Sequence, residues 1–461
     1  MRARGPPTLD RSRRPVSGPA PKIQLPRFER LPLGNELTLL AVRHDDLPEV
    51  SVRLVIPSGA ADDHRDRAGT ALLTARALTE GTEERSAHEV AQALDFIGAR
   101  LNVEVTHDGT ILSLAFLSRV FDEAIELLAE IVSRPAFEES EVDRLKDKRL
   151  DEIVSGRDEP RIVANLNLAG AIFGDHPYGL SAGGVEETVK TLSGADLREF
   201  HDRYYRPAAA TLVLVGDLPG SEELAKRLES VFSGWNGDAA AQTTLPDPDP
   251  IAARRIWAVD WSGPQSELRI GGVGIARLDP VYPAVKVMNS IVGGLFSSRL
   301  NMNLREDKGW TYGASSRFEG RKQRGPFRAA TAVDAQHTAA AVREMLSEIE
   351  SMHTTPPTRE ELELARNALT LSMPRLFETV NQVAARVGDQ VIYGLPEDYW
   401  ERYSDLVRDV SAAEVHDAAV RYLDSDRLAV VVVGPVAELK EELAELGDLE
   451  FRDVDGRPAS A

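Results

Sequence analysis

The sequence predicts an α+β fold made of two homologous, mixed α/β domains related by internal duplication, and three observations lead to this prediction. The segment LSGADLREFHDRYYRPAAATLVLVG, which begins at Leu192, aligns without a gap on VSAAEVHDAAVRYLDSDRLAVVVVG, which begins at Val410, at an offset of 218 residues. A second pair, FEESEVDRLKDKRLDEI from Phe137 and PTREELELARNALTLSM from Pro357, aligns at an offset close to 220. Each half also mixes strands and helices without the regular βαβ alternation of a doubly wound sheet.

The repeated unit has the same local signals in both copies. Ser193 and Ser411 are followed three residues later by Asp196 and Glu414, which is the pattern of a capping box at a helix start. The apolar runs TLVLVG and AVVVVG that follow predict buried strands. Further upstream, FDEAIELLAEIV and AAAVREMLSEIE each have the apolar spacing of an amphipathic helix. Each copy therefore predicts a helix followed by a strand that ends at glycine.

The duplication divides the chain into five segments. Between the halves lies a segment with three prolines and little apolar content, which predicts a linker. We expect a disordered or wrapping tail at 1–25, an N-terminal domain at 26–235, the linker at 236–255, a C-terminal domain at 256–445 and a C-terminal tail at 446–461.

Composition excludes several classes of function. The chain has 461 residues and a net charge of −20, which argues against binding to nucleic acid or to an anionic membrane surface. It has no cysteine, so disulfides, thiolate nucleophiles and cysteine metal sites are excluded. No apolar run is long enough to span a membrane. The first 26 residues hold six prolines and no apolar core of a secretory signal, so we expect a cytoplasmic rather than a periplasmic protein.

Several stretches together resemble the pitrilysin/insulinase superfamily of zinc peptidases, and in particular the mitochondrial-processing-peptidase type. They are RLPLGNELTLLAVRHDDLPEVSVRLVIPSGAADD, AGTALLTARALTEGT, IGARLNVEVTHDGT, FGDHPYGL and GGLFSSRLNMNLREDKGWTYGASS, and they extend over nearly the whole chain after residue 25. The resemblance implies a clam-like assembly, in which this chain and a partner enclose a chamber.

The zinc motif of that family is degenerate here. Aligned on His-x-x-Glu-His, AGTALLTARALTEGT places Leu72, Ala75 and Arg76 at the first ligand, the catalytic base and the second ligand. Glu152 lies 76 positions after Arg76, close to where the family has its third ligand. A zinc site on a helix needs two imidazoles four residues apart, and none of the nine histidines has such a partner. We therefore expect no metal and no cofactor in this chain, and no peptide hydrolysis by it alone.

The substrate-binding half of the site is kept. Arg305 and Tyr312 in LREDKGWTY have the family's spacing of seven, and the resemblance implies that they donate hydrogen bonds to substrate and to the developing oxyanion. A guanidinium is a permanent forked donor and a phenol is a neutral one, so both suit this role. Asn102 and Thr106 in LNVEVT are expected on a strand whose backbone edge binds an extended peptide by strand addition.

Two functions from different classes remain open. The first is the non-zinc, substrate-binding subunit of a heterodimeric metallopeptidase that acts on unfolded peptides, with a homologous partner subunit carrying the zinc. The second is a catalytically inactive structural or assembly protein of the same fold, like the core subunits of respiratory cytochrome bc complexes. An active peptidase with a misaligned motif is disfavoured by the scattered histidines. Retention of Arg305 and Tyr312 favours the first function.

Overall fold

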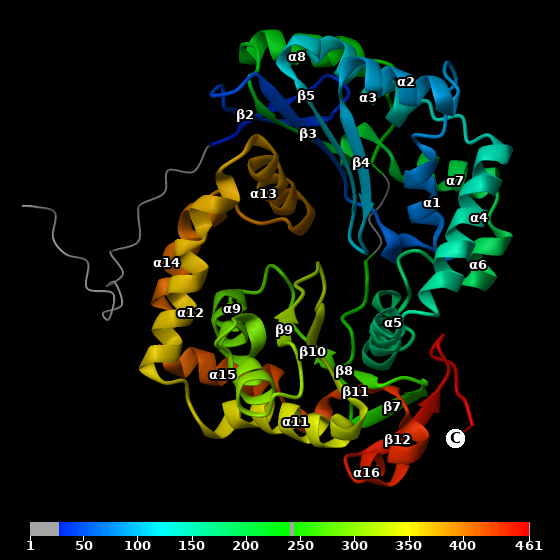
Figure 1. Cartoon of the computed structure of the whole chain (residues 1–461). Helices are drawn as coiled ribbons and strands as arrows, with labels where there is room; N and C mark the ends of the chain where they lie inside the picture. The colour runs from blue at the N-terminus through cyan, green and yellow to red at the C-terminus, as the bar shows by residue number, and fades with distance from the viewer. Residues whose placement is uncertain (1–26, 240–243, 461) are drawn as a thin grey trace, which may run out of the picture.

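The chain forms two six-stranded mixed sheets that face each other across a central hollow, with helices packed around them (Figure 1). This computed structural model describes residues 27–239 and 244–460. The tail predicted at 1–25 lies outside the described residues, and so does part of the predicted linker, 240–243. The described part of that linker has neither helix nor strand before Arg255.

The two sheets have equivalent strand orders. The first runs β1-β2-β6-β3-β5-β4 and the second β12-β7-β11-β8-β10-β9. The strands of the first sheet are β1 (Glu29–Pro32), β2 (Thr38–Arg43), β3 (Glu49–Ile56), β4 (Arg100–Val105), β5 (Thr110–Leu117) and β6 (Thr211–Gly216). Those of the second are β7 (Arg255–Asp260), β8 (Gln265–Val273), β9 (Ala314–Phe318), β10 (Pro326–Asp334), β11 (Ala429–Gly434) and β12 (Asp448–Arg452). The pairs β2/β6 and β7/β11 are parallel at the same place in each sheet, which confirms two homologous α+β domains.

The repeated unit folds as predicted. Helices α7 (Gly194–Tyr204) and α15 (Ala412–Tyr422) lead into the buried strands β6 and β11. The Ser193 hydroxyl accepts from the backbone N–H of Asp196, and the Ser411 hydroxyl accepts from that of Glu414. Both carboxylates bond back to the N-cap residue, so both predicted capping boxes are confirmed.

The remaining helices pack on the outer faces of the sheets or on one another at the sides, and they build one main core in each half. In the first half they are α1 (Thr70–Ala77), α2 (Ala87–Ile97), α3 (Phe121–Ser133), α4 (Glu139–Gly156), α6 (Glu186–Thr191) and α8 (Ser221–Phe232). In the second half they are α9 (Tyr282–Asn289), α10 (Arg299–Asn301), α11 (Thr338–Thr354), α12 (Arg359–Leu371), α14 (Tyr399–Asp409) and α16 (Lys440–Ala444).

Two helices are exchanged between the halves. Helix α5 (Pro160–Phe173) belongs to the first half but packs on β8 and β11 of the second sheet, where Leu168 and Val431 share one buried cluster. Helix α13 (Val380–Tyr393) belongs to the second half but packs on β3 and β6 of the first sheet, where Val383 and Val213 share another. Figure 1 shows α13 under the first sheet and α5 beside the second. Each half thus supplies part of the other's core.

A buried polar clasp joins the tips of two equivalent hairpins, β4–β5 and β9–β10. The Asp108 carboxylate accepts from the Tyr178 hydroxyl at 2.5 Å and from the backbone N–H of Lys322 at 2.9 Å. The Lys322 ammonium donates to the carbonyl of Pro57 at 3.1 Å. Charge-assisted bonds of this kind are strong where water is excluded, so the clasp fixes the two hairpin tips, and with them the two sheets, relative to each other.

The segment FGDHPYGL supports this clasp. His107 Nε2 lies 3.0 Å from the carbonyl oxygen of Leu180, and its ring meets that of Tyr178 edge-on at 5.5 Å. Burial, reinforced by the nearby Arg321 cation, lowers the pKa of His107 to about 4, so it is neutral at physiological pH. His176 Nδ1 accepts from the backbone N–H of Tyr178 at 3.1 Å and acts as a turn residue.

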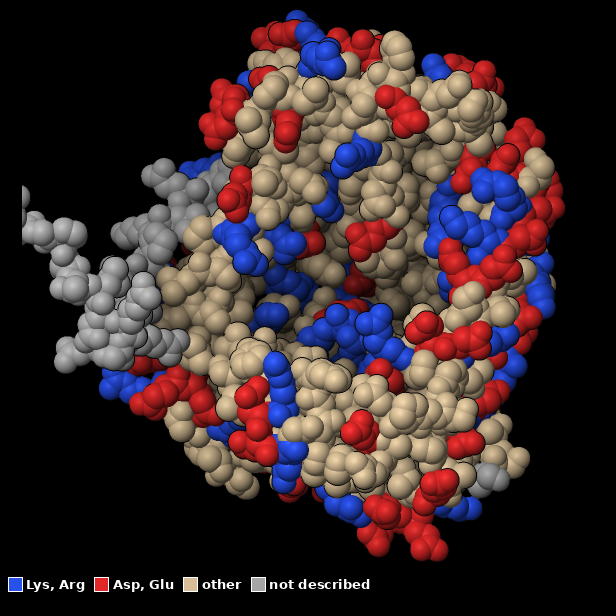
Figure 2. Space-filling view, in the orientation of Figure 1, with Lys and Arg blue, Asp and Glu red and all other residues tan. Residues whose placement is uncertain are grey.

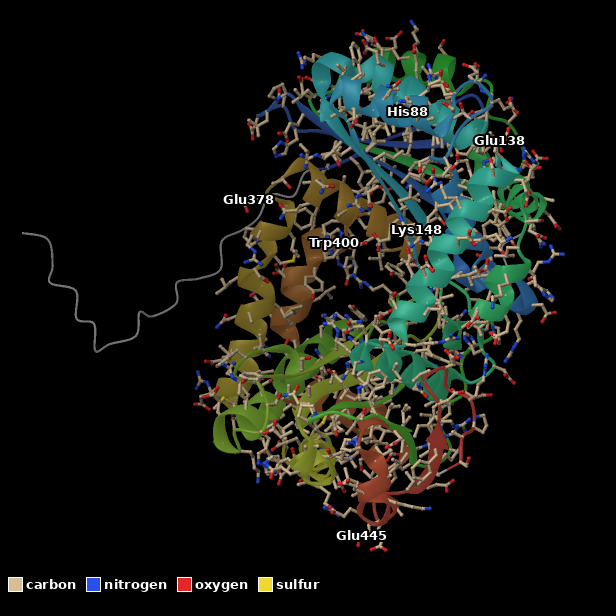
Figure 3. All side chains as sticks on the ribbon, turned by 45° about the vertical axis from the view of Figure 1, so that its right-hand side comes forward. His88, Glu138, Lys148, Glu378, Trp400 and Glu445 are labelled. Atoms are coloured by element: carbon tan, nitrogen blue, oxygen red, sulfur yellow. The ribbon has the colours of Figure 1, made fainter. Side chains whose placement is uncertain are left out.

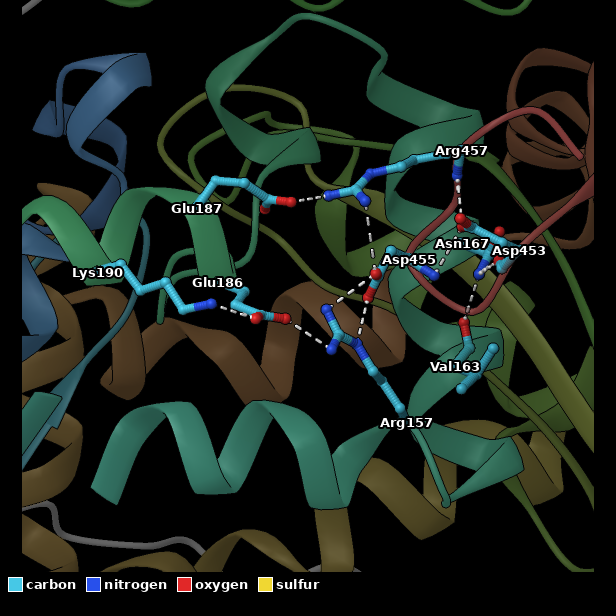
Figure 4. Close-up of polar contacts among 9 residues, drawn as sticks. All are labelled: Arg157, Val163, Asn167, Glu186, Glu187, Lys190, Asp453, Asp455 and Arg457. Carbon is cyan, nitrogen blue, oxygen red and sulfur yellow. Dashed lines mark hydrogen bonds and ion pairs between the residues drawn. The ribbon is translucent and has the colours of Figure 1, made fainter. Parts of the chain in front are cut away.

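The C-terminal segment differs from the tail predicted at 446–461. Strand β12 pairs in parallel with β7 at the edge of the second sheet. Beyond it, Asp455 accepts two bonds of 2.9 Å from Arg157, which follows the last residue of α4, and Arg457 pairs with Glu187 of α6 (Figure 4). An edge strand lacks the strong apolar periodicity of a central one, so this ordered strap gives little sequence signal.

Candidate functional site

The degenerate zinc motif lies on α1, beside α4. Ala75 is fully buried, with 0% of its surface exposed, while Leu72 and Arg76 are half-buried. Arg76 Nη1 donates to both carboxylate oxygens of Glu152, at 3.0 and 3.1 Å. Arg149 donates to the same carboxylate at 3.0 Å, from one turn earlier on α4. The structure therefore brings Arg76 and Glu152 together, as the family alignment implies, but as an ion pair.

This ion pair joins two of the positions that the sequence resemblance assigns to the metal site. Partial burial alone would raise the pKa of Glu152, but hydrogen bonds from Arg149 and Arg76 outweigh it and hold the pKa below its usual value. The carboxylate is thus ionised and already neutralised by two guanidiniums. Leu72 and Ala75 offer no ligand atom, and the described residues contain no group of three His, Asp or Glu side chains placed to hold a metal. The residues present do not fit a zinc ion.

The helix that would carry the motif is nevertheless well formed. Its first turn is fixed by Asp63, whose two carboxylate oxygens accept from the backbone N–H groups of Gly69 and Ala71 at 2.8 Å each. Gly69 has φ of +100°, a conformation that suits glycine, where the chain turns into α1. Helix α1 is therefore regular and well anchored, although Leu72 and Ala75 on it offer no metal ligand.

Arg305 and Tyr312 lie on the surface of the second domain. Arg305 belongs to a π-helical turn, Met302–Asp307, and its guanidinium lies 4.5 Å from the centre of the exposed Phe296 ring. Its Nε is 3.5 Å from a carboxylate oxygen of Glu306, a long contact at an exposed site. Tyr312 follows in the loop before β9 and is 94% exposed. A tyrosine this exposed contributes nothing to the chain's own core.

Of the two positions predicted on the peptide-binding strand, Asn102 lies on it and Thr106 does not. Asn102 is exposed on β4, the last strand of the first sheet, and among the described residues 101–105 make no backbone hydrogen bond beyond their ladder with β5. Thr106 differs from the expectation because it lies one residue beyond β4. Its backbone N–H donates to the Gly109 carbonyl and its own carbonyl accepts from Ala60, so it closes the hairpin and cannot pair with a peptide.

The hollow between the sheets carries charge that sequence reasoning did not assign. Figure 2 shows Lys and Arg side chains gathered on its floor, where Figure 1 draws β8, β9 and β10. Turned by 45°, the same hollow is bordered by α4, which carries Lys148, and by α14, which carries Trp400 (Figure 3). Arg149 was also missed, although its spacing of three from Glu152 on one helix is a recognisable pairing signal.

The fold defines a class of protein: a peptidase scaffold of two homologous mixed α/β domains. The model of "Insulinase (Peptidase family M16)" matches residues 39–184, and that of "Peptidase M16 inactive domain" matches residues 191–369. The chain therefore belongs to the insulinase family of peptidases, as the sequence resemblance predicts.

Curated relatives and solved structures agree with this. An "uncharacterized zinc protease" of Mycobacterium tuberculosis is 28% identical over 440 residues, covering 92% of this chain and 96% of its own. A "non-peptidase homolog" of Helicobacter pylori is 24% identical over 390 residues, covering 84% and 89%. The crystal structure of a "peptidase M16 inactive domain" from Pseudomonas fluorescens superimposes with a TM-score of 0.83 at 27% identity, covering 89% of this chain and 98% of that one. Within the described residues, no helix is both long and apolar enough to cross a bilayer.

Proposed function

We propose that this chain is the non-zinc, substrate-binding subunit of a heterodimeric metallopeptidase of the insulinase type, acting on unfolded peptides. The homologous partner subunit would carry the zinc ion, for which the described residues of this chain offer no set of three ligands. Arg305 and Tyr312 would be contributed to the partner's site. Asn102 on the unpaired edge of β4 would align the peptide by strand addition.

The observation that carries the proposal is the exposure of the two donors. Tyr312 is 94% exposed, and Arg305 has only the long contact with Glu306 as an ion pair among the described residues. Tyr312 packs against none of the core, and the half-buried Arg305 lies against the exposed Phe296 ring. Both remain available to a group outside the chain, such as a peptide carbonyl that gains negative charge during cleavage.

Reconstitution with a zinc-bearing homologous subunit tests the proposal. Activity should appear only in the mixture, and Tyr312→Phe or Arg305→Ala should each lower turnover on the order of 100–1,000-fold, as loss of one oxyanion donor does. Arg359→Ala, on the exposed start of α12 and paired with Glu363, is the matched control and should leave activity unchanged. Complex size is measured in parallel and should stay the same for all variants.

The alternative is a structural or assembly protein of the same fold, and the same experiment separates it. In that case any effect of Tyr312→Phe or Arg305→Ala would come through loss of the complex. Full activity in an intact complex that carries both substitutions would defeat the split active site.

A further inference from the structure

We infer that the floor of the hollow, formed by Arg317 of β9 and Arg328 of β10 with the buried Arg269 of β8 beneath them, is a binding site for carboxylate-rich, acidic segments of extended peptides. The inference rests on the proposed function in treating that peptide as substrate, but the binding itself needs no partner subunit.

The strand pattern places these arginines on one face. On β10, Phe327 and Ala329 point into the core of the second domain, so Arg328 between them points to the opposite face. On β8, Arg269 lies between the core residues Leu268 and Ile270. Helix α5 covers only part of this face, because it packs over β8 and β11. The rest faces the hollow, where Figure 2 shows the basic floor.

The positive charges of these arginines repel one another. Arg317 and Arg328 are direct cross-strand neighbours, a placement that is destabilising for like charges. Arg269 and Arg328 each donate at 2.9 Å to the same side-chain oxygen of Asn165, which orients both guanidiniums without neutralising either. Burial, with the positive charges of Arg317 and Arg269, lowers the pKa of Arg328 to about 10.

Acidic side chains compensate only part of this charge. Arg269 pairs with Glu267 at 2.7 Å, and Glu319 is shared between Arg321 at 2.8 Å and Arg317 at 3.5 Å. Among the described residues, Arg328 has no carboxylate within 4.0 Å. Two glutamates thus face four arginines, and Arg161 of α5 adds a further positive charge beside Arg269 and Arg328. An incoming carboxylate would relieve this excess.

The shape of the site favours a peptide over other anions. A small pocket between α5 and the β9–β10 hairpin is lined by Arg317, Arg328 and Asn165 together with the apolar side chains of Ile172 and Phe173. Its lining also includes Glu319, which is already paired with Arg321 and Arg317, so Arg328 remains as the cation that an incoming carboxylate would meet. The unpaired edge of β4 borders the same hollow (Figure 1).

The test is fluorescence anisotropy with the full chain and a labelled peptide of alternating Glu and Ala. This peptide should bind more tightly than one with Lys in place of Glu, and its affinity should fall as salt is added. Arg317→Gln and Arg328→Gln should each weaken binding on the order of ten-fold, the value of one charge-assisted hydrogen bond. Arg359→Gln on the outer helix α12 removes the same charge and should change nothing.

Three results would overturn the inference. They are equal binding of the Glu and Lys peptides, unchanged binding by the folded Arg317→Gln/Arg328→Gln double variant, and tighter binding of a single-stranded oligonucleotide than of the acidic peptide. Each leaves the proposed split active site untouched, because that is measured by turnover of the reconstituted pair. Conversely, a reconstituted pair without activity leaves the peptide-binding result standing.

Discussion

Replacing Leu72 and Arg76 by histidine should create a zinc site at the place of the present ion pair. The double substitution puts two imidazoles four residues apart on α1 and frees Glu152 of α4 as the third ligand, a set that zinc binds in many enzymes. An imidazole is shorter than an arginine side chain, so an ion can lie between the ring and the carboxylate. Arg149 still contacts Glu152 and is the one group that competes with the metal.

The expected changes in the free energy of unfolding are large enough to measure. Arg76 and Glu152 are joined by contacts of 3.0 and 3.1 Å, with side chains 30% and 33% exposed, so losing the pair should cost about 1–2 kcal/mol in the free energy of unfolding. Zinc at a hundred times its dissociation constant stabilises the folded variant by about 2.7 kcal/mol. The metal-free variant should thus unfold below the parent and the zinc-loaded variant at or above it.

Thermal unfolding with and without zinc, together with elemental analysis after dialysis, checks this. The parent should hold far less than one zinc per chain and should show no shift. Adding Glu152→Gln to the double variant removes the third ligand and should abolish the zinc response, which makes it the matched control. If the double variant folds but its unfolding midpoint ignores zinc, or if the parent responds equally, the reasoning about this site is refuted.

Three further predictions follow from buried or charged positions. Ala75→Glu should destabilise the chain by about 2 kcal/mol or more in denaturant unfolding, because a carboxylate enters a fully buried position, whereas Ala75→Ser should have a much smaller effect. Folding lowers the pKa of His107 to about 4 from its unfolded value of about 6.5, so this residue destabilises the folded state increasingly as the pH falls below 6.5. By pH 4 the loss in the free energy of unfolding approaches about 3 kcal/mol. His107→Gln should therefore flatten the pH dependence of the unfolding midpoint between pH 7 and 5. Arg328→Gln should not lower the midpoint and should raise stability by up to about 1 kcal/mol, because it removes the repulsion with Arg317; a clear loss of stability would show that the basic floor supports the fold.

Local patterns predicted much of this fold. The capping boxes at Ser193 and Ser411 and the apolar runs that follow specify a helix and a buried strand through contacts between close neighbours in the chain. The repeat then predicts that the two halves have the same order of helices and strands. That Leu72 and Arg76 offer no imidazole to a metal can also be seen from the sequence, because ligand chemistry depends on residue type.

Long-range partners were not predictable in this way. Amphipathic spacing shows that one face of α5 is buried but does not show which sheet buries it. The family resemblance implied that Arg76 and Glu152 lie close together, but it did not predict that the two side chains form an ion pair. The basic floor brings Arg317 and Arg328 of the β9–β10 hairpin next to the buried Arg269 of β8, and the strand register that does this has no local pattern in the sequence.

The exchange of α5 and α13 has a consequence for how such a chain can be made and how it can have arisen. During synthesis the first sheet leaves the ribosome before α13, so one of its faces stays uncovered until most of the second half has been translated. A chain of half this length would face the same deficit permanently and could cover its sheet only by lending its helix to a second copy. The duplicated polypeptide is thus the architecture expected when the two partners of a helix-swapped dimer are joined end to end.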